Sequence, residues 1–178
     1  MNNIANFQAI AQQNQTTTEE ALQLFDELEP VDIEFMLGRW QGSGFPTHHP
    51  MDGLLEAFNW YGKEFISADH VHPLLFTDGN SIFKVDPNPI VMNLGLSLPI
   101  PKNEGLKPLY SAMNKMLKTE QSKARIRMME YRGKVSATMI YDYLPINDVF
   151  RKVDNNTVLG LMDYKSVPQP FFFTLKRE

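Results

Sequence analysis

The feature that most constrains the fold is the C-terminal part of the chain, where strand-like runs follow one another with only tight turns between them. The run KARIRMMEYRGKVSATMIYDYLPI pairs two segments about residues 131–134, and DVFRKVDNNTVLGLMDYK pairs two more about residues 154–156. The run PFFFTLKRE closes the series. Strands that are joined in sequence by tight turns form an antiparallel meander. The pattern therefore predicts a sheet whose strands lie side by side in chain order.

Before this meander the chain mixes helical and extended patterns. Pro30 ends a run with apolar residues at helical spacing, so we expect a helix over residues 17–28. The run DGLLEAFNWYGKEF predicts a helix that gives way to a strand near Trp60. Apolar runs flank Asp-Gly-Asn at residues 78–80, which is a strong signal for a hairpin turn. The run LKPLYSAMNKMLKTEQ again has helical spacing and predicts a further helix.

Two segments have weaker patterns. Residues 1–15 are rich in Asn and Gln, and we expect either a flexible N-terminal arm or a short helix there. The run DPNPIVMNLGLSLPIPKNEG is interrupted by Pro and Gly and predicts a long connection, part of which could act as a lid over a binding site. We therefore expect one domain over residues 16–178, built from one half at 31–88 and another at 105–178.

Composition and charge limit the function classes. The 178 residues are 43% hydrophobic, enough for one domain with a real core. The net charge of −4 provides no basic face for a nucleic acid, so we expect no such partner. Cysteine is absent, which excludes disulfides, thiolate nucleophiles and cysteine metal sites. The start of the sequence lacks a signal-peptide pattern and no run reaches the roughly 20 apolar residues of a membrane span, so we expect a cytoplasmic protein.

The segment GRWQGSG carries a resemblance to known folds. Alternation places Trp40, Gly42 and Gly44 on one face of a strand, with glycines where another backbone or a large side chain must come close. Together with the hairpin meander and the aromatic closing strand, this segment is similar to the entry strand of calycin-type barrels. The resemblance implies that the tryptophan plugs one end of the barrel.

More closely, the chain resembles the family named for its GxWxG motif, whose members carry a companion C-terminal domain of unknown function. The matching segments lie within residues 31–177 and are GRWQGSG, HPMDGLLEAFNWYGKEF, HVHPLLF, MIYDYLPINDVFRKVD and VLGLMDYKSVPQPFFFTLKR. The resemblance implies a compact β-rich domain and no particular reaction. A more distant resemblance is to nitrobindin-like barrels, which bind haem through a histidine late in the chain. No histidine follows His72 here, so we expect no haem and no other cofactor.

These patterns predict an α+β protein. Its main element is an antiparallel, calycin-like β-barrel or strongly curved sheet, with an N-terminal helix and one or two further helices. Ten methionines and twelve phenylalanines supply adaptable apolar volume. A barrel lined by such side chains suits a flexible apolar ligand.

The candidate site residues are polar or aromatic side chains in apolar runs. His70 and His72 would lie on one side of a strand, about 7 Å apart, where they suit either a ligand contact or, with a third ligand, a metal ion. Asp142 needs a partner if it is buried, and we expect an arginine to supply it, either Arg125, Arg127 or Arg151. The residues that we expect to contact a ligand are Trp60, His70, His72, Arg127, Tyr141, Asp142, Arg151 and Asp163.

Other charged residues have simpler explanations. Asp163 either closes a turn or lies beside a histidine, where it would raise the pKa of the imidazole. Asp52 is expected to cap a helix. Lys63 is expected to be a solvated charge. We assign no catalytic residue and no metal site from the sequence.

Three functions remain open at this point. The one that we favour is the binding of a small hydrophobic or amphipathic organic ligand in a barrel cavity. The second is a cofactor-independent isomerase, hydratase or hydrolase in which His70 or His72 works with Asp142 or Asp163. The third is a structural or partner-binding module with a filled barrel, and a homodimer is compatible with it.

Overall fold

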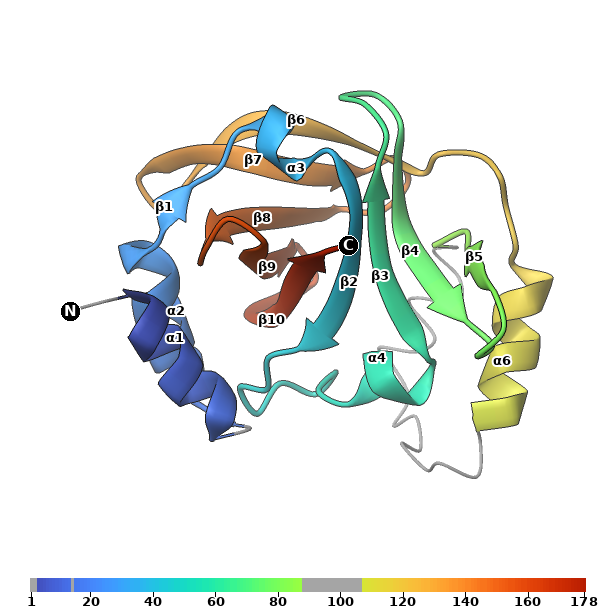
Figure 1. Cartoon of the computed structure of the whole chain (residues 1–178), viewed down its shortest axis with the longest axis horizontal. Helices are drawn as coiled ribbons and strands as arrows, with labels where there is room; N and C mark the ends of the chain where they lie inside the picture. The colour runs from blue at the N-terminus through green and yellow to red at the C-terminus, as the bar shows by residue number, and fades with distance from the viewer. Residues whose placement is uncertain (1–2, 14, 88–106) are drawn as a thin grey trace.

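The computed structural model describes residues 3–13, 15–87 and 107–178 (Figure 1). The segment VMNLGLSLPIP, expected as a lid, lies outside these residues. The helices are α1 (Asn3–Gln12), α2 (Thr18–Glu27), α3 (Ile33–Met36), α4 (Leu54–Ala57) and α6 (Lys107–Met116). The strands are β1 (Glu29–Pro30), β2 (Gly38–Gly44), β3 (Trp60–Phe65), β4 (Val71–Thr77), β5 (Ile82–Lys84), β6 (Ala124–Tyr131), β7 (Lys134–Tyr141), β8 (Ile146–Lys152), β9 (Thr157–Tyr164) and β10 (Val167–Arg177).

The strands close into an antiparallel barrel. Hydrogen-bonded neighbours follow the order β8-β7-β6-β4-β3-β2-β10-β9, and the β8–β9 pairing completes the circuit of eight strands. The contact between β4 and β6 is a single pair, Val71 with Ala124, whereas β6 and β7 pair along their full length. The short strands β1 and β5 pair with β8 and β4. The predicted α+β fold with an antiparallel β-barrel is confirmed.

The local predictions from sequence agree with these elements. The expected helix over 17–28 is α2, and Thr17 and Glu20 form a capping box at its start. The hairpins predicted at residues 78–80, 131–134 and 154–156 join β4 to β5, β6 to β7 and β8 to β9. Of the two alternatives for the N-terminal segment, the structure contains the helix, α1. No helix within the described residues is both long enough and apolar enough to cross a membrane.

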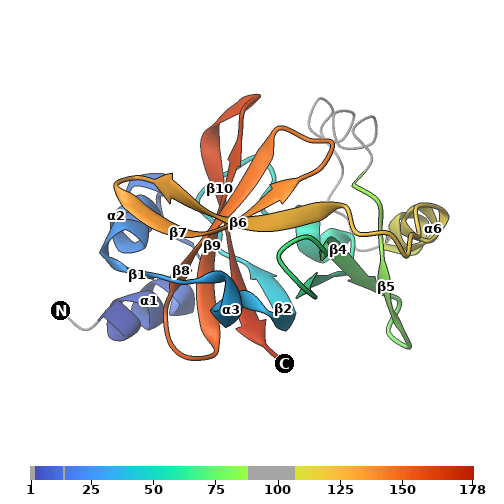
Figure 2. The same ribbon diagram turned by 90° about the horizontal axis from the view of Figure 1, so that it is seen from above.

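Helices cover two opposite sides of the barrel. Figures 1 and 2 show α1 and α2 on one side and α6 on the other. The apolar face of α2, with Leu24 and Phe25, packs on outward-facing residues of the barrel wall, among them Val149 and Phe172. This outer cluster is separate from the larger cluster that fills the barrel interior. The inward and outward sides of each strand can therefore be assigned from the cluster to which its residues belong.

One end of the barrel is closed around Trp40, which is 0% exposed. Its Nε1 donates a hydrogen bond to the carbonyl oxygen of Met36, at the end of α3, over 2.8 Å. The Arg177 guanidinium lies 4.2 Å from the centre of the Trp40 ring and donates to the carbonyl oxygens of Phe35 and Leu37. These contacts fix α3 and the last strand over the indole. Trp40 therefore has the structural role that the resemblance to calycin-type barrels implies.

Candidate functional site

An ion pair lies inside the barrel. The ammonium Nζ of Lys63, on β3, is 2.8 Å from Oδ2 of Asp148, on β8, and the two side chains are 4% and 1% exposed. The same ammonium donates a hydrogen bond to the carbonyl oxygen of Pro73 over 3.1 Å. Removing two charges from water has a large desolvation penalty, so such a pair needs good geometry and further hydrogen bonds. We therefore build the candidate functional site outward from this buried ion pair.

A β-bulge turns Lys63 inward. Gly62 has a φ of 151° and sits between two register shifts in the β3–β4 pairing. A Cβ at this position would lie 1.9 Å from the carbonyl oxygen of Trp40, so only glycine fits there. The bulge interrupts the alternation of side chains along β3, so that Trp60 and Lys63, three positions apart, are both buried. The expectation that Lys63 is a solvated charge is therefore wrong.

Asp148 reaches the interior by ordinary alternation along β8. It is paired in register with Met139 on β7 and with Met162 on β9, and all three side chains are buried. Burial raises the pKa of Asp148, and the Lys63 ammonium opposes that shift. Burial, followed by the charge of Asp148, raises the pKa of Tyr141 well above its ordinary value.

Aromatic rings surround the Lys63 ammonium. Its Nζ lies 5.0 Å from the ring centre of Phe173 and 5.7 Å from those of Trp60 and Tyr141. A cation within about 6 Å of an aromatic face is stabilised by about 0.5–2 kcal/mol, the larger value applying where water is excluded. The rings therefore compensate part of the desolvation penalty of the buried cation.

Two glycines make room for these rings. A Cβ on Gly42 would lie 2.2 Å from the Trp60 ring, and a Cβ on Gly160 would lie 2.4 Å from the Phe173 ring. Both distances are far shorter than real carbon contacts. The glycine at position 42 of the GRWQGSG segment thus accommodates the tryptophan of β3 rather than the tryptophan of its own strand.

Two polar atoms of this cluster lack hydrogen-bond partners among the described residues. They are Oδ1 of Asp148, an acceptor, and Nε1 of Trp60, a donor, and both are buried. Leaving such an atom unpaired costs about 1–3 kcal/mol, and more for a charged group. The arrangement combines one acceptor, one donor and an ion pair in an apolar interior.

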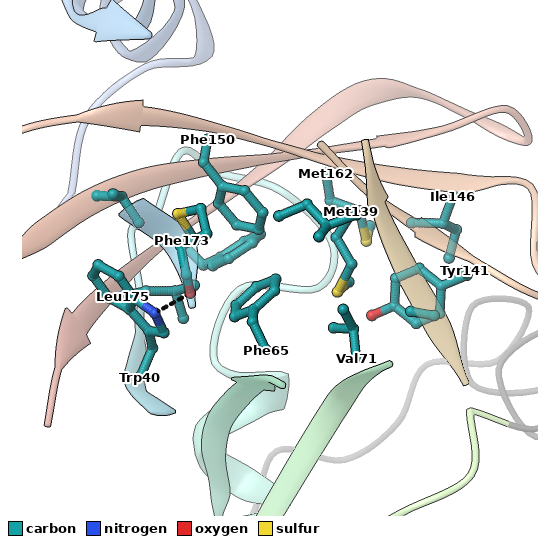
Figure 3. Close-up of a cluster of buried hydrophobic side chains, with 14 of the residues drawn as sticks. Trp40, Phe65, Val71, Met139, Tyr141, Ile146, Phe150, Met162, Phe173 and Leu175 are labelled. Atoms are coloured by element: carbon teal, nitrogen blue, oxygen red, sulfur yellow. Dashed lines mark hydrogen bonds between the residues drawn. The ribbon is translucent and has the colours of Figure 1, made fainter. Parts of the chain in front are cut away.

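The two ends of the interior differ in their exposure. Around the Trp40 end, Val158 and Leu175 are 0% exposed, whereas Tyr141 and Leu144 are each 7% exposed. Figure 3 shows Trp40 and Leu175 at one end of the cluster and Tyr141 at the other.

A separate hollow lies outside the barrel. It has a volume of about 910 Å³ and lies between α1 and the barrel wall, where its lining includes Phe7, Phe45, Val153 and Lys176. The rings of Phe7 and Phe45 stack with their centres 5.8 Å apart. This groove is a second place where an apolar molecule could lie, and the experiments below distinguish it from the interior.

Comparisons with known proteins agree with this architecture. The chain matches the family model described as GXWXG protein over residues 23–80 and the domain of unknown function DUF4334 over residues 122–177. A crystal structure of a protein from Thermomonospora curvata is 33% identical, covers 100% of this chain and 99% of its own, and superposes with a TM-score of 0.73. The chain belongs to the family that joins an N-terminal GXWXG domain to a C-terminal DUF4334 domain. No match was found among curated proteins.

In this GXWXG family member, two of the residues predicted to contact a ligand lie at the interior site. They are Trp60 and Tyr141, whose rings face the Lys63 ammonium. The other predicted residues lie elsewhere. His70 is in the β3–β4 turn, where its Nδ1 is 3.0 Å from Oγ of Ser67.

His72 is buried beside the outward-facing Glu64 of β3, and this burial lowers the pKa of its imidazole. Neither His70 nor His72 forms a hydrogen bond or ion pair with Asp142 or Asp163 within the described part of the chain. The acid–base pair of the enzyme hypothesis is therefore not assembled there.

The predicted arginines and aspartates also lie outside the barrel interior. Asp142 pairs with Arg125 at 2.9 Å, which is one of the three partners expected for it. Arg127 binds Asp69 at the β3–β4 turn. Arg151 lies under α2, with its guanidinium 4.7 Å from the centre of the Phe25 ring.

Asp163 follows the inward-facing Met162 on β9 and is partly exposed. A ligand contact at any of these outer residues would require a separate site on the surface.

Asp52 accepts hydrogen bonds from the backbone N–H groups of Thr47 and His49, so it organises the loop before α4. No group of three or more His, Cys, Asp or Glu side chains within the described residues could hold a metal ion.

Sequence reasoning missed Lys63 and Asp148 as site residues. The sequence did contain a signal for Asp148. Strict alternation along the strand places it on the same face as the apolar residues Ile146 and Phe150, which lie on either side of it on that face. No comparable signal exists for Lys63, because its orientation depends on the bulge at Gly62.

Proposed function

We propose that the barrel binds a small, uncharged, amphipathic organic molecule that carries a hydroxyl or carbonyl group. The observation that carries the proposal is the pair of buried polar atoms without partners, Oδ1 of Asp148 and Nε1 of Trp60, beside the Lys63 ammonium. A hydroxyl group both donates and accepts, so it can satisfy the carboxylate oxygen and the indole N–H. A carbonyl group can satisfy the indole alone.

The charge of the site favours a neutral ligand. Lys63 and Asp148 already neutralise one another at 2.8 Å, so a further charge on the ligand would be buried without a counter-ion. An anionic ligand would compete with Asp148 for the ammonium, and it would approach a carboxylate whose pKa burial has already raised. Alcohols and carbonyl compounds avoid both penalties.

The remainder of the interior suits an apolar body. Met139 and Met162 flank Asp148 on the neighbouring strands, and the rings of Tyr141 and Phe173 lie around the ammonium. Methionine side chains repack easily around differently shaped ligands. Each CH₂ group that leaves water contributes about 0.8 kcal/mol, so a short alkyl chain supplies most of the affinity and the polar group supplies the selectivity.

Titration calorimetry with matched probes tests the proposal. We would compare octanol, octanal, octanoate and chlorooctane, after native mass spectrometry has shown whether an organic molecule co-purifies. Octanol should bind about tenfold more tightly than chlorooctane, since one well-formed hydrogen bond to a buried group is worth about 1–2 kcal/mol. Octanoate should bind more weakly than octanol.

A pair of double variants localises the binding. Lys63→Met with Asp148→Leu removes the buried ion pair without leaving a lone charge, and it should abolish the preference for octanol over chlorooctane. Arg125→Met with Asp142→Leu removes an exposed pair of the same chemistry and should leave that preference intact. Equal binding of octanol and chlorooctane to the unaltered protein would refute the proposal. Binding that survives the buried double variant but is lost in Phe7→Ala would place the ligand in the outer groove and would also refute it.

A further inference from the structure

We propose that Lys63 forms a covalent imine with aldehyde or ketone ligands inside the barrel. This inference rests on the proposed function, since the carbonyl compound must first enter the same interior. It goes beyond that function, because it assigns to Lys63 a chemical step rather than a binding contact.

The surroundings of the Lys63 nitrogen suit a protonated imine as well as they suit an ammonium ion. The carboxylate of Asp148 at 2.8 Å would be its counter-ion, and three aromatic rings lie within 5.7 Å of the nitrogen. An iminium ion carries the same single positive charge as the ammonium. The attractions that stabilise the reactant therefore also stabilise the product.

The two oxygens of Asp148 can serve different atoms in this reaction. Oδ2 contacts the lysine nitrogen, and Oδ1 is buried without a partner among the described residues. Oδ1 is thus the oxygen available to the ligand. A carboxylate that contacts the amine through one oxygen and the carbonyl group through the other can move protons between them without solvent. Burial raises the pKa of Asp148, which makes it a better proton acceptor than an exposed aspartate.

The step is balanced without any further reactant. Asp148 takes one proton from the ammonium, and the amine lone pair then attacks the carbonyl carbon to form a C–N bond. The electron pair of the C=O bond moves to oxygen, which receives the proton from Asp148. Asp148 then takes a second proton from nitrogen and passes it to the hydroxyl group, which leaves as water as the C=N bond forms. Ammonium and carbonyl compound become iminium and water, with no change of oxidation state.

Reductive trapping tests the inference. The protein would be incubated with one equivalent of octanal and sodium cyanoborohydride, which near neutral pH reduces an iminium ion but not the free aldehyde, then digested and examined by peptide mass spectrometry for octyl-lysine. We expect Lys63 to be modified before the exposed Lys165, which serves as an internal control in the same sample. Excess octanol should protect Lys63 and leave the modification of Lys165 unchanged. The modified site should disappear in Lys63→Arg, which keeps the positive charge but cannot form an imine.

The outcomes separate this inference from the proposed function. If octanal binds by calorimetry but Lys63 stays unmodified while Lys165 reacts, the imine is refuted and the binding function stands. If octanol does not bind and does not protect Lys63, the proposed function fails. Because the peptide assay uses the unaltered protein, a folding defect in Lys63→Arg would not obscure the result. Slower modification of Lys63 in Asp148→Asn than in Asp142→Asn would support the proton-transfer role of Asp148.

Discussion

Replacing Lys63 with methionine removes the cation of the buried ion pair and keeps a side chain of similar length. Asp148, which is 1% exposed, would then be a buried carboxylate without a counter-ion, and the carbonyl oxygen of Pro73 would lose its donor. Breaking a buried pair from one side costs about 3–5 kcal/mol. The free energy of unfolding of a typical domain is about 5–15 kcal/mol, so the variant should fold but be much less stable.

The loss of stability in Lys63→Met should depend on pH. Burial raises the pKa of Asp148 even in the intact protein, where the ammonium opposes the shift, so the pKa should rise further in the variant. The native variant then holds a proton that the unfolded chain releases near the ordinary aspartate pKa of about 3.9. Between the pKa of Asp148 in the unfolded chain and its higher pKa in the native variant, the native state binds more protons than the unfolded state. The free energy of unfolding therefore falls as pH rises through that window. The deficit relative to the unaltered protein should be smallest near the lower limit and largest at neutral pH.

Urea denaturation followed by circular dichroism at several pH values measures this deficit. The double variant Lys63→Met with Asp148→Leu is the matched control, and it should recover most of the lost stability, because replacing both charges by apolar groups is close to neutral or stabilising. A single variant that loses less than about 1 kcal/mol, as an exposed pair would, contradicts the reasoning. A deficit that does not change with pH, or a double variant as unstable as the single one, would contradict it as well.

Further substitutions test other parts of the structure. Gly42→Ala should cost about 1–3 kcal/mol in urea denaturation, because the new methyl group would lie 2.2 Å from the Trp60 ring and the ring must move; unchanged stability and tryptophan fluorescence would contradict the close packing. Arg177→Met should cost about 2 kcal/mol, because the guanidinium hydrogen bonds over Trp40 are lost; a thermal melt within error of the unaltered protein would count against the closing role of Arg177. Burial lowers the pKa of His72, so the unfolded chain binds more protons as pH falls below about 6.5, and stability should fall there. His72→Gln should flatten that part of the stability–pH curve, and an unchanged slope would refute the assignment.

The sequence by itself determined the local elements of this protein. The capping box of α2 and the turns at residues 78–80, 131–134 and 154–156 depend on residues within a few positions of one another. Their chemistry therefore shows in the sequence, and so does the antiparallel meander that the hairpins build. The segment GRWQGSG, together with the hairpin meander and the aromatic closing strand, indicated a barrel, and with the other matching segments it indicated the family.

The candidate site was only partly accessible from sequence. Trp60 and Tyr141 were predicted because aromatic residues in apolar strands are natural lining residues, and both lie at the ammonium. The charged residues chosen with them, such as Arg151, occupy the outer face. In a strand a shift of one residue reverses every side chain, so a polar residue in an apolar run can face either way until the register is known.

Only the tertiary structure decided what lies inside the barrel. The pairings of β2 with β10 and of β4 with β6 close the circuit between strands that are far apart in sequence. The residue at the bulge must be glycine, because the backbone of Trp40, on the neighbouring strand, leaves no room for a Cβ at position 62. The bulge turns Lys63 toward Asp148 across the interior. The site therefore arises from long-range packing, in which each residue's orientation is fixed by atoms that its own sequence neighbours do not supply.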